Sequence, residues 1–309
     1  MKFIGFDKVS LETILKYLEA NDQNEMMAKT ISTAHMTDFK FSDKYVMKRL
    51  GAPEFLFFSQ FLQPANETQK KFATLLPLVH GLLWDPVTDS CFIAMENFCS
   101  SQSCSQLEIK VGCYNFLPVH FEEKQQSKFR SSFLLGSIDD NYRVCMFVRK
   151  GMDGTTIEKK KIVKGPNGVK QRVTPNSLEL ILTPKPEEQG KMEFLKKAFD
   201  YFEERLLFMH AIFKNEIKDL GFLITAASLM FLIDFKEETY RLVFFDFGCS
   251  APCSRMDLWP DEQAVATIAI LENLREVRKK IFETPIPAQI ATAAPTETPA
   301  PAHPEEPAK

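Results

Sequence analysis

Apolar residues recur at every second position, or in short unbroken runs, in several parts of this chain. Such patterns predict β-strands, here residues 45–50, 91–98 and 143–148 and a hairpin made of 228–233 and 242–245. Elsewhere apolar residues recur every three or four positions, which predicts amphipathic helices. The predicted helices are one that begins at Ser10 and those at 54–61, 194–209 and 265–281. This mixture and order of elements predicts an α+β fold.

Two segments lack these patterns. Residues 151–172 are rich in Lys, Gly and polar residues, which predicts an exposed loop. Its cations are Lys159, Lys160, Lys161, Lys164, Lys170 and Arg172. A solvated loop is the favoured interpretation, with nuclear import or phosphate capture as alternatives. After Phe282 the chain has seven prolines among Ala, Thr and Glu, so residues 283–309 are expected to be a disordered tail.

Composition narrows the class of protein. The chain has 309 residues, 45% hydrophobic, including 28 Phe, which is enough for a large core in one or two domains. The formal net charge of -3 does not favour nucleic acid or a membrane surface as a partner. The longest nearly apolar run, residues 222–233, is too short to span a bilayer, which takes ~20 residues. We expect a monomer with no nucleic-acid partner and no membrane span.

The cysteines indicate a reducing compartment. There are 7, an odd number without regular spacing, and no secretory leader precedes them. Cys99, Cys104 and Cys113 are close in sequence but lack the paired C-x-x-C spacing and nearby histidines of a zinc site. We therefore expect a cytoplasmic or nuclear protein with free thiols.

Asp246 is the first candidate for chemistry. It follows the second strand of the predicted hairpin, in Phe244-Phe245-Asp246-Phe247-Gly248, so its carboxylate should emerge at a rigid strand end beside a glycine. A carboxylate in such a place suits magnesium, because a hard cation prefers oxygen ligands. The Asp-Phe-Gly triplet also occurs in protein kinases. However, no Gly-rich loop precedes Lys48 and no His-Arg-Asp with a following Asn is present, which argues against that class.

Lys48, Glu96 and Asn97 suggest a nucleotide site. Lys48 alternates with apolar neighbours on a predicted strand, so its ammonium could point inward to nucleotide phosphates. A solvated strand lysine is the alternative. Glu96 and Asn97 follow an apolar strand, as in a hinge whose backbone binds adenine and whose polar side chain reaches ribose. A simple turn at a strand end would give the same pattern.

Glu108 and Lys110 are two positions apart on a predicted strand, so they should share one face and could meet one ligand. An ordinary surface ion pair, worth at most ~1 kcal/mol, is the alternative. Further along, residues 122–130 carry Lys124, Gln125, Gln126, Lys128 and Arg130. On a helix these donors would suit several phosphates, although a solvated charged helix explains them as well.

Taken in order, these segments resemble the inositol polyphosphate kinase family, which includes the multikinase, the trisphosphate 3-kinases and the hexakisphosphate kinases. That family has P-x-x-x-D-x-K-x-G, then S-S-L-L before a hairpin, then I-D-F-A-H. The corresponding segments here are Cys104 to Gly112, with Cys104 for Pro and Glu108 for Asp, Ala227-Ser228-Leu229-Met230, and Phe245-Asp246-Phe247-Gly248-Cys249, with Cys249 for His. Weaker matches are His80 to Trp84 for Tyr-Gly-x-Trp, Met95-Glu96-Asn97 for the Leu-Glu-Asp hinge and Leu271 to Leu274 for the closing helix. The resemblance covers residues 40–281, most of the folded chain.

The resemblance implies a two-lobed kinase-like fold, related to the ATP-grasp and protein-kinase folds. It implies a smaller β-rich N-terminal lobe (1–98) and a larger α+β C-terminal lobe (99–282) with the inositol phosphate and metal sites. The implied cofactors are ATP and magnesium, and the implied substrate is an inositol polyphosphate. By position, Lys48 would contact ATP phosphates, Glu96 and Asn97 would form the hinge, and Asp246 would hold magnesium. Glu108 and Lys110 would lie between nucleotide and substrate, and Lys124, Gln125, Gln126 and Lys128 would bind the inositol phosphate.

Two functions follow. The first is an ATP-dependent inositol polyphosphate kinase with Lys110, Glu108 and Asp246 as catalytic residues. The compact spacing from Lys110 to Lys124 favours a multikinase-like site. The second is a weak or inactive relative that binds inositol phosphates or acts as a protein scaffold, because Cys104, Glu108 and Cys249 depart from the family motifs.

Overall fold

The computed structural model describes residues 2–4, 13–14, 16–18, 20, 39–85, 89–112, 142–161, 177–224, 227–248, 250–252 and 262–283, and the structural statements below concern these residues. Several predicted features lie outside them, namely the stretch from Lys124 to Arg130, Cys113, Cys249, the cations from Lys164 to Arg172, and the proline-rich tail.

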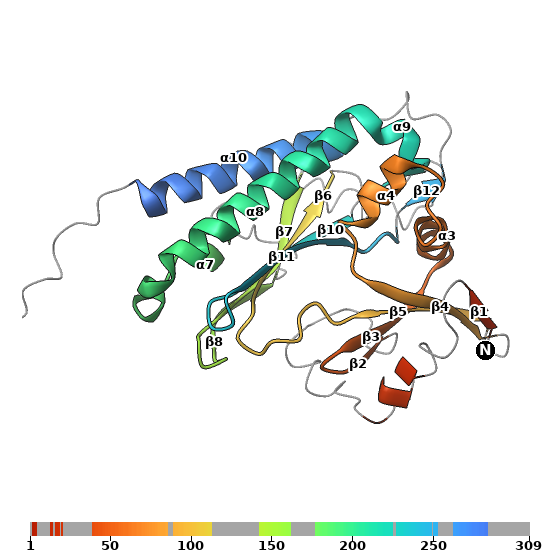
Figure 1. Ribbon diagram of the computed structural model, residues 1–309, viewed down its shortest axis with the longest axis horizontal. Helices are drawn as coiled ribbons and strands as arrows, with labels where there is room; N and C mark the ends of the chain where they lie inside the picture. Colours follow the sequence, from red (N-terminus) through yellow and green to blue (C-terminus); the bar gives the residue numbers. More distant parts are fainter. Residues whose placement is uncertain are drawn as a thin grey trace, which may run out of the picture.

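An antiparallel five-stranded sheet forms the N-terminal part, in the order β1-β4-β5-β3-β2 (Figure 1). Its strands are β1 (Lys2–Ile4), β2 (Phe39–Phe41), β3 (Tyr45–Leu50), β4 (Val79–Asp85) and β5 (Ser90–Glu96). One face of this sheet carries Val46 and Ile93 into the main core. On the other face Met47 packs with Ile14 and Leu18, two apolar residues of the first predicted helix.

Two helices, α3 (Ala52–Phe61) and α4 (Glu67–Ala73), join β3 to β4. The chain leaves β3 at Gly51, the N-cap of α3, and proline in the first turn of α3 suits a helix start. Asn66 caps α4 by accepting a hydrogen bond from the Gln69 amide at 2.8 Å. The buried aromatic rings of these helices contact rings that follow in the C-terminal part; for example, Phe57 stacks on Phe247 at 3.9 Å between centroids. This aromatic cluster joins the two parts of the molecule.

A second antiparallel sheet has the order β11-β10-β6-β7-β8. Its strands are β6 (Ser105–Val111), β7 (Tyr142–Lys150), β8 (Thr156–Lys161), β10 (Ala227–Asp234) and β11 (Thr239–Phe245). The long helices α8 (Met192–Ala211) and α10 (Glu262–Phe282) lie side by side over this sheet, with α7 (Ser177–Leu182) nearby (Figure 1). Shorter elements are a 3-10 helix η3 (Pro186–Lys191), a π-helical turn η4 (Ile212–Glu216), α9 (Ile217–Leu220) and a small sheet of β9 (Phe222–Leu223) with β12 (Ala251–Pro252).

The predicted α+β class is confirmed, and each strand predicted from the sequence lies within or overlaps an observed one. The helices predicted at 54–61, 194–209 and 265–281 are also present. The loop predicted over 151–172 is wrong in part, because residues 156–161 form β8. Lysines at an edge strand are compatible with a strand, since one side of an edge faces solvent and charge there discourages pairing with another chain. The run of lysines at 159–161 therefore led to the prediction of a loop where the chain forms a strand.

A buried ion pair fixes the far end of this second sheet. Arg149 on β7 pairs with Glu188 in η3, and both side chains are buried. The guanidinium also lies over the Phe235 ring, at 4.7 Å from its centroid. Burying two charges is tolerable only when they are paired and hydrogen-bonded. The ion pair therefore holds β7 and η3 together.

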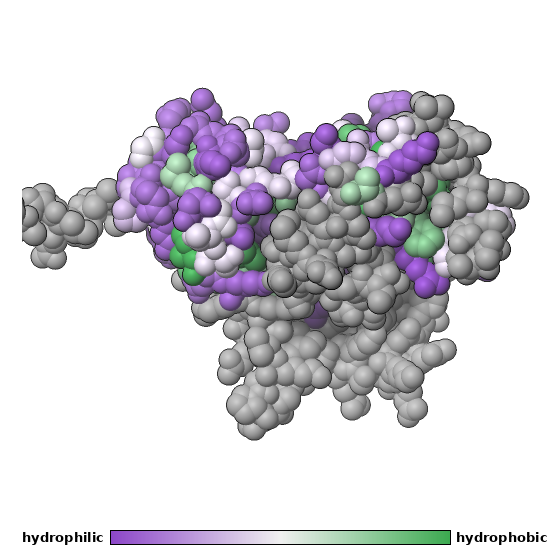
Figure 2. Space-filling view, turned by 90° about the horizontal axis from the view of Figure 1, so that it is seen from below, coloured by the Kyte–Doolittle hydropathy of each residue, from purple (hydrophilic) through white to green (hydrophobic). Residues whose placement is uncertain are grey.

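Within the described ranges, no helix has both the length and the apolar character that a membrane crossing requires. On the face shown in Figure 2, the residues that are coloured are mainly hydrophilic, and hydrophobic ones occur in small separate patches.

Candidate active site

Lys48 and Glu54 form the N-terminal side of the site. Lys48 lies on β3 and Glu54 lies in the first turn of α3, and Lys48 Nζ is 2.8 Å from Glu54 Oε1. The Glu54 side chain is only 5% exposed. Burial raises the pKa of Glu54, and the attraction of Lys48 offsets this only in part. Glu54 also accepts a hydrogen bond from the Phe247 amide at 3.4 Å, so α3 is tied to the segment after β11.

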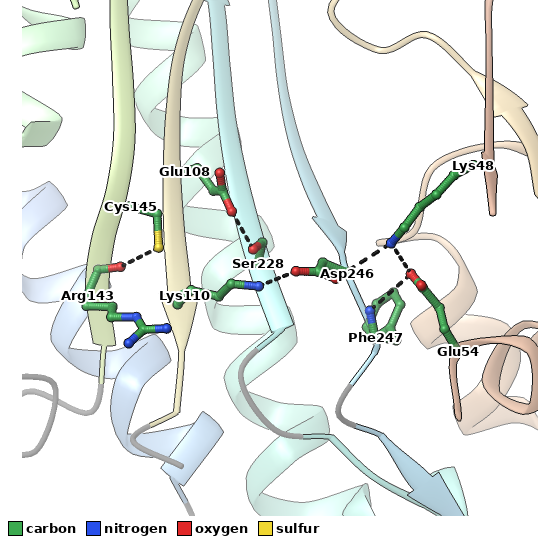
Figure 3. A network of polar contacts seen from close by, with 9 residues as sticks. All are labelled: Lys48, Glu54, Glu108, Lys110, Arg143, Cys145, Ser228, Asp246 and Phe247. Carbon is green, nitrogen blue, oxygen red and sulfur yellow. Dashed lines mark hydrogen bonds and ion pairs between the residues drawn. The ribbon is translucent and has the colours of Figure 1, made fainter. Parts of the chain in front are cut away.

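Asp246 adopts a left-handed backbone conformation, with φ at 63°. Such a conformation is uncommon for a residue other than glycine and is strained, so the surroundings must hold it. The next residue, Phe247, is fully buried and stacks on Phe57, which anchors the turn. The turn thereby directs the Asp246 carboxylate into the space between the two sheets (Figure 3).

Lys110 and Lys48 both contact this carboxylate. Lys110 Nζ pairs with Asp246 Oδ2, and Lys48 Nζ lies 3.6 Å from Asp246 Oδ1 (Figure 3). Burial alone would raise the pKa of Asp246, but the two ammonium groups outweigh it and lower the pKa to about 2. Burial likewise opposes the charge of Lys110, and Asp246 and Glu108 more than compensate, so its pKa is raised. Asp246 and Lys110 are therefore both charged at neutral pH.

Glu108 lies on the same strand as Lys110, and β10 provides its partner. Ser228 donates a hydrogen bond to Glu108 Oε1 at 2.7 Å and stands opposite Lys110 in the β6–β10 pairing. On the other side of β6, a register shift between Glu108 and Ile109 places Arg143 of β7 opposite Lys110. Figure 3 shows Glu108, Lys110 and Asp246 near the end of β6 and the start of β10.

Glu96 and Asn97 lie at the end of β5, where the chain passes from one sheet to the other. Arg241 of β11 pairs with Glu96 at 2.5 Å, and the Leu78 amide donates to the same carboxylate at 2.6 Å. The Asn97 side chain donates to the Ser42 carbonyl at 2.7 Å and accepts from the Cys99 amide at 3.0 Å. Both side chains thus already have protein partners, and their role toward a nucleotide stays a prediction.

Three residues of this site were not identified from the sequence. Glu54 follows Lys48 by six positions in a helix start, which is a usable signal for an ion pair but a weak one. Ser228 was part of a motif without an assigned role. Arg143 could be found only from the pairing of β6 with β7, because no local pattern marks it.

The carboxylate and the lysines fit a metal–nucleotide better than a metal alone. Among the residues that the structure describes, no group of three or more His, Cys, Asp or Glu side chains could hold a cation. Magnesium is usually bound through one or two carboxylates, with phosphate oxygens and waters as its other ligands. Asp246 is an ionised carboxylate with a 39% exposed side chain, and it stands between two ammonium groups that could receive phosphates.

Two solved structures with a similar fold are inositol phosphate multikinases. The enzyme Ipk2 of S. cerevisiae, solved in complex with ADP and Mn2+, matches with a TM-score of 0.56 at 13% sequence identity, over 75% of this chain and 98% of that one. A second inositol phosphate multikinase structure matches with a TM-score of 0.53 at 14% identity, over 72% of this chain and 99% of that one. No protein-family model and no curated protein sequence matches the chain. The chain therefore has the inositol phosphate multikinase fold, which confirms the two-lobed kinase-like architecture expected from the sequence.

Proposed function

We propose that this protein is an ATP-dependent inositol polyphosphate kinase that transfers the γ-phosphate of ATP to an inositol phosphate, with a multikinase-like substrate site. The observation that carries this proposal is the meeting of Asp246, Lys48 and Lys110, which come from three different strands or strand ends. A carboxylate and two ammonium groups are the parts that phosphoryl transfer needs, because positioning and charge neutralisation supply most of its catalysis. The shared fold with multikinases supports the same conclusion.

Each residue has a role in this proposal. Asp246 would hold a divalent cation, magnesium in our proposal, which would neutralise phosphate charge. When the nucleotide binds, Lys48 and Lys110 would contact phosphate oxygens in place of the Asp246 carboxylate. Glu54 would keep Lys48 in position. Glu96 and Asn97 would offer hinge backbone groups to the base.

On the substrate side, Lys110 would neutralise charge where the inositol hydroxyl attacks, and a loose transition state requires no strong base. Glu108 is placed beside it. Arg143 would add a cation next to Lys110, and Lys124, Gln125, Gln126 and Lys128 would bind the other phosphates of the inositol ring. We propose that the protein acts in the cytoplasm or the nucleus.

The decisive experiment is a panel of inositol tris-, tetrakis- and hexakisphosphates incubated with ATP and magnesium, with products resolved by chromatography. Turnover on at least one of them should disappear in Asp246→Asn. Asp200→Asn on α8 is the matched control, because Asp200 is exposed and pairs with Arg278 of α10, which is not a residue of the candidate site. It should not affect turnover.

A second candidate is an inactive relative that binds inositol phosphates or a protein partner. One observation favours it: both polar groups of the Asn97 side chain are engaged inside the protein, which leaves ribose without that contact. Substitutions at Cys104, Glu108 and Cys249 in the family motifs agree with it. Protein that binds ATP with magnesium but phosphorylates no member of the panel would favour this second function.

A further inference from the structure

A cavity of about 310 Å³ lies beside the end of α3, and its lining residues do not include Lys48, Glu54, Lys110 or Asp246. Two of its lining residues, Leu78 and Arg241, contact Glu96. Its apolar wall is made of Phe58, Phe61 and Leu62 at the end of α3. The segment 73–79 after α4 forms a second wall, and Arg241 of β11 forms the third. Leu78 stands there with 58% of its surface exposed, so a large apolar side chain remains open to solvent.

The polar side of this cavity is positive. Arg241 is held by Glu96, and this hydrogen bond keeps its pKa raised. That contact uses one of the five N–H donors of the guanidinium. Next to it, Arg205 of α8 donates to the carbonyl of Thr74, a lining residue, at 2.5 Å. Arg205 Nε is buried and has no hydrogen-bond partner among the described residues. Of these two guanidinium groups, only that of Arg241 pairs with a carboxylate among the described residues, namely that of Glu96.

We propose that this cavity binds a small organic anion, with an aromatic or branched apolar body and a single carboxylate or sulfonate. The body fits against Phe58, Phe61 and Leu62, and the acid group meets Arg241. An apolar occupant alone would leave the remaining N–H donors of Arg241 without an acceptor, and a polyphosphate has no apolar body to place against the aromatic wall. This occupant is therefore different in class from the nucleotide and the inositol phosphate.

The position of the cavity would allow a bound ligand to affect the candidate active site. Its walls belong to both parts of the molecule, since α3 and the 73–79 segment are N-terminal and β11 belongs to the second sheet. Phe58 also contacts Phe247, at 5.6 Å between centroids, and Phe247 is the neighbour of Asp246. A ligand that bridges these elements would alter nucleotide affinity, and that consequence rests on the proposed function, whereas binding itself does not.

The test uses 3-phenylpropanoate as the probe and 3-phenylpropan-1-ol as its neutral counterpart, with binding to the full chain measured by calorimetry or ligand-observed NMR. The anion should bind about tenfold more tightly, because a hydrogen bond to a charged acceptor is roughly twice as strong as a neutral one. Arg241→Gln should remove this preference. Ala73→Leu, which places a larger side chain in the cavity, and Leu78→Ser, which removes apolar surface at the cavity, should both weaken binding of the anion.

Leu56→Ser is the matched control, since Leu56 is 49% exposed on the same helix α3 but does not line the cavity. It should leave binding unchanged. Equal affinity for the anion and the alcohol would overturn the proposal, as would anion binding that survives both Ala73→Leu and Leu78→Ser. If Ala73→Leu does not fold, Leu78→Ser alone decides, because an exposed side chain can be replaced without disturbing the core. Loss of inositol phosphate turnover would bear on the proposed function and not on this binding.

Discussion

Lys110 and Asp246 form an ion pair although they are 136 positions apart in the sequence. Lys48, from the N-terminal sheet, reaches the other oxygen of the same carboxylate at 3.6 Å. One carboxylate therefore contacts two lysines from different sheets, and Glu54 provides a second carboxylate for Lys48. Binding of a metal–nucleotide would replace these internal contacts, so the two lysines are already positioned without being left as unpaired charges.

The pH dependence of stability tests this arrangement. The pKa of Asp246 is lowered from 3.8 to about 2, so its contribution to folding is complete above pH 4 and is lost as the pH falls through about 2. Two pKa units set an upper limit, and because the side chain is 39% exposed we expect less than about 2 kcal/mol. Chemical unfolding of wild type and Asp246→Asn between pH 5 and pH 2 should give a difference that shrinks with acid. A difference that does not change over this range would mean that the lysines do not hold the carboxylate.

The two lysines should separate binding from chemistry. Lys110→Ala should lower turnover by a factor of about 100 or more, the loss typical of a group that stabilises transition-state charge. It should leave nucleotide affinity largely intact, because Lys48 remains. Lys48→Ala should instead weaken nucleotide binding directly. Titration with a fluorescent ATP analogue, together with turnover rates, distinguishes the two. Comparable loss of affinity and turnover in Lys110→Ala would show that Lys110 has been assigned the wrong place.

Substrate binding should depend on residues that do not affect the nucleotide. Arg143 lies opposite Lys110, and Lys124 and Lys128 belong to the stretch that resembles an inositol-binding helix. Arg143→Ala and the double variant Lys124→Ala/Lys128→Ala should each raise KM for the inositol phosphate about tenfold, as expected when a charged hydrogen bond to phosphate is lost. KM for ATP should stay within about twofold.

The matched control for these variants is Lys196→Ala/Lys197→Ala, which removes two exposed lysines from α8. It changes the net charge by the same amount as the double variant. An equal rise of KM in this control would show that Lys124 and Lys128 act only by general electrostatic attraction of a polyanion.

Strand and helix periodicity predicted most of the elements, and the motifs marked Lys110 and Asp246, which the structure pairs in the candidate site. The sequence did not predict which residues from distant segments contact one another. Glu54 looks like any acidic residue in a first helical turn, and only the packing of α3 against Phe247 makes it the partner of Lys48. The lysine run of β8 has the composition of a loop, and a strand forms because Val148 and its neighbours on β7 supply the hydrogen-bonding edge.

The buried pair of Arg149 and Glu188 should be the most sensitive point for stability outside the site. Arg149→Met leaves Glu188 as an unpaired buried charge, which should cost about 3–5 kcal/mol of unfolding free energy. The double variant Arg149→Met/Glu188→Leu removes both charges and should be clearly more stable than the single one. Urea unfolding followed by circular dichroism measures both. A double variant as unstable as the single one would show that the pair matters for packing and not for charge.

The contact between Ser228 and Glu108 tests whether Glu108, which stands where the family has Asp, still places its carboxylate for chemistry. Glu108 is one methylene longer than the family Asp, and its carboxylate reaches Ser228 at 2.7 Å. If this contact positions the carboxylate for chemistry, Ser228→Ala and Glu108→Asp should each lower kcat about tenfold, and the double variant should lose little more, because both changes remove the same interaction. ATP affinity should change little in all three. Additive losses would mean that Glu108 and Ser228 act separately. An increase of activity in Glu108→Asp would instead show that the longer side chain impairs a kinase site, and would favour the weakly active relative.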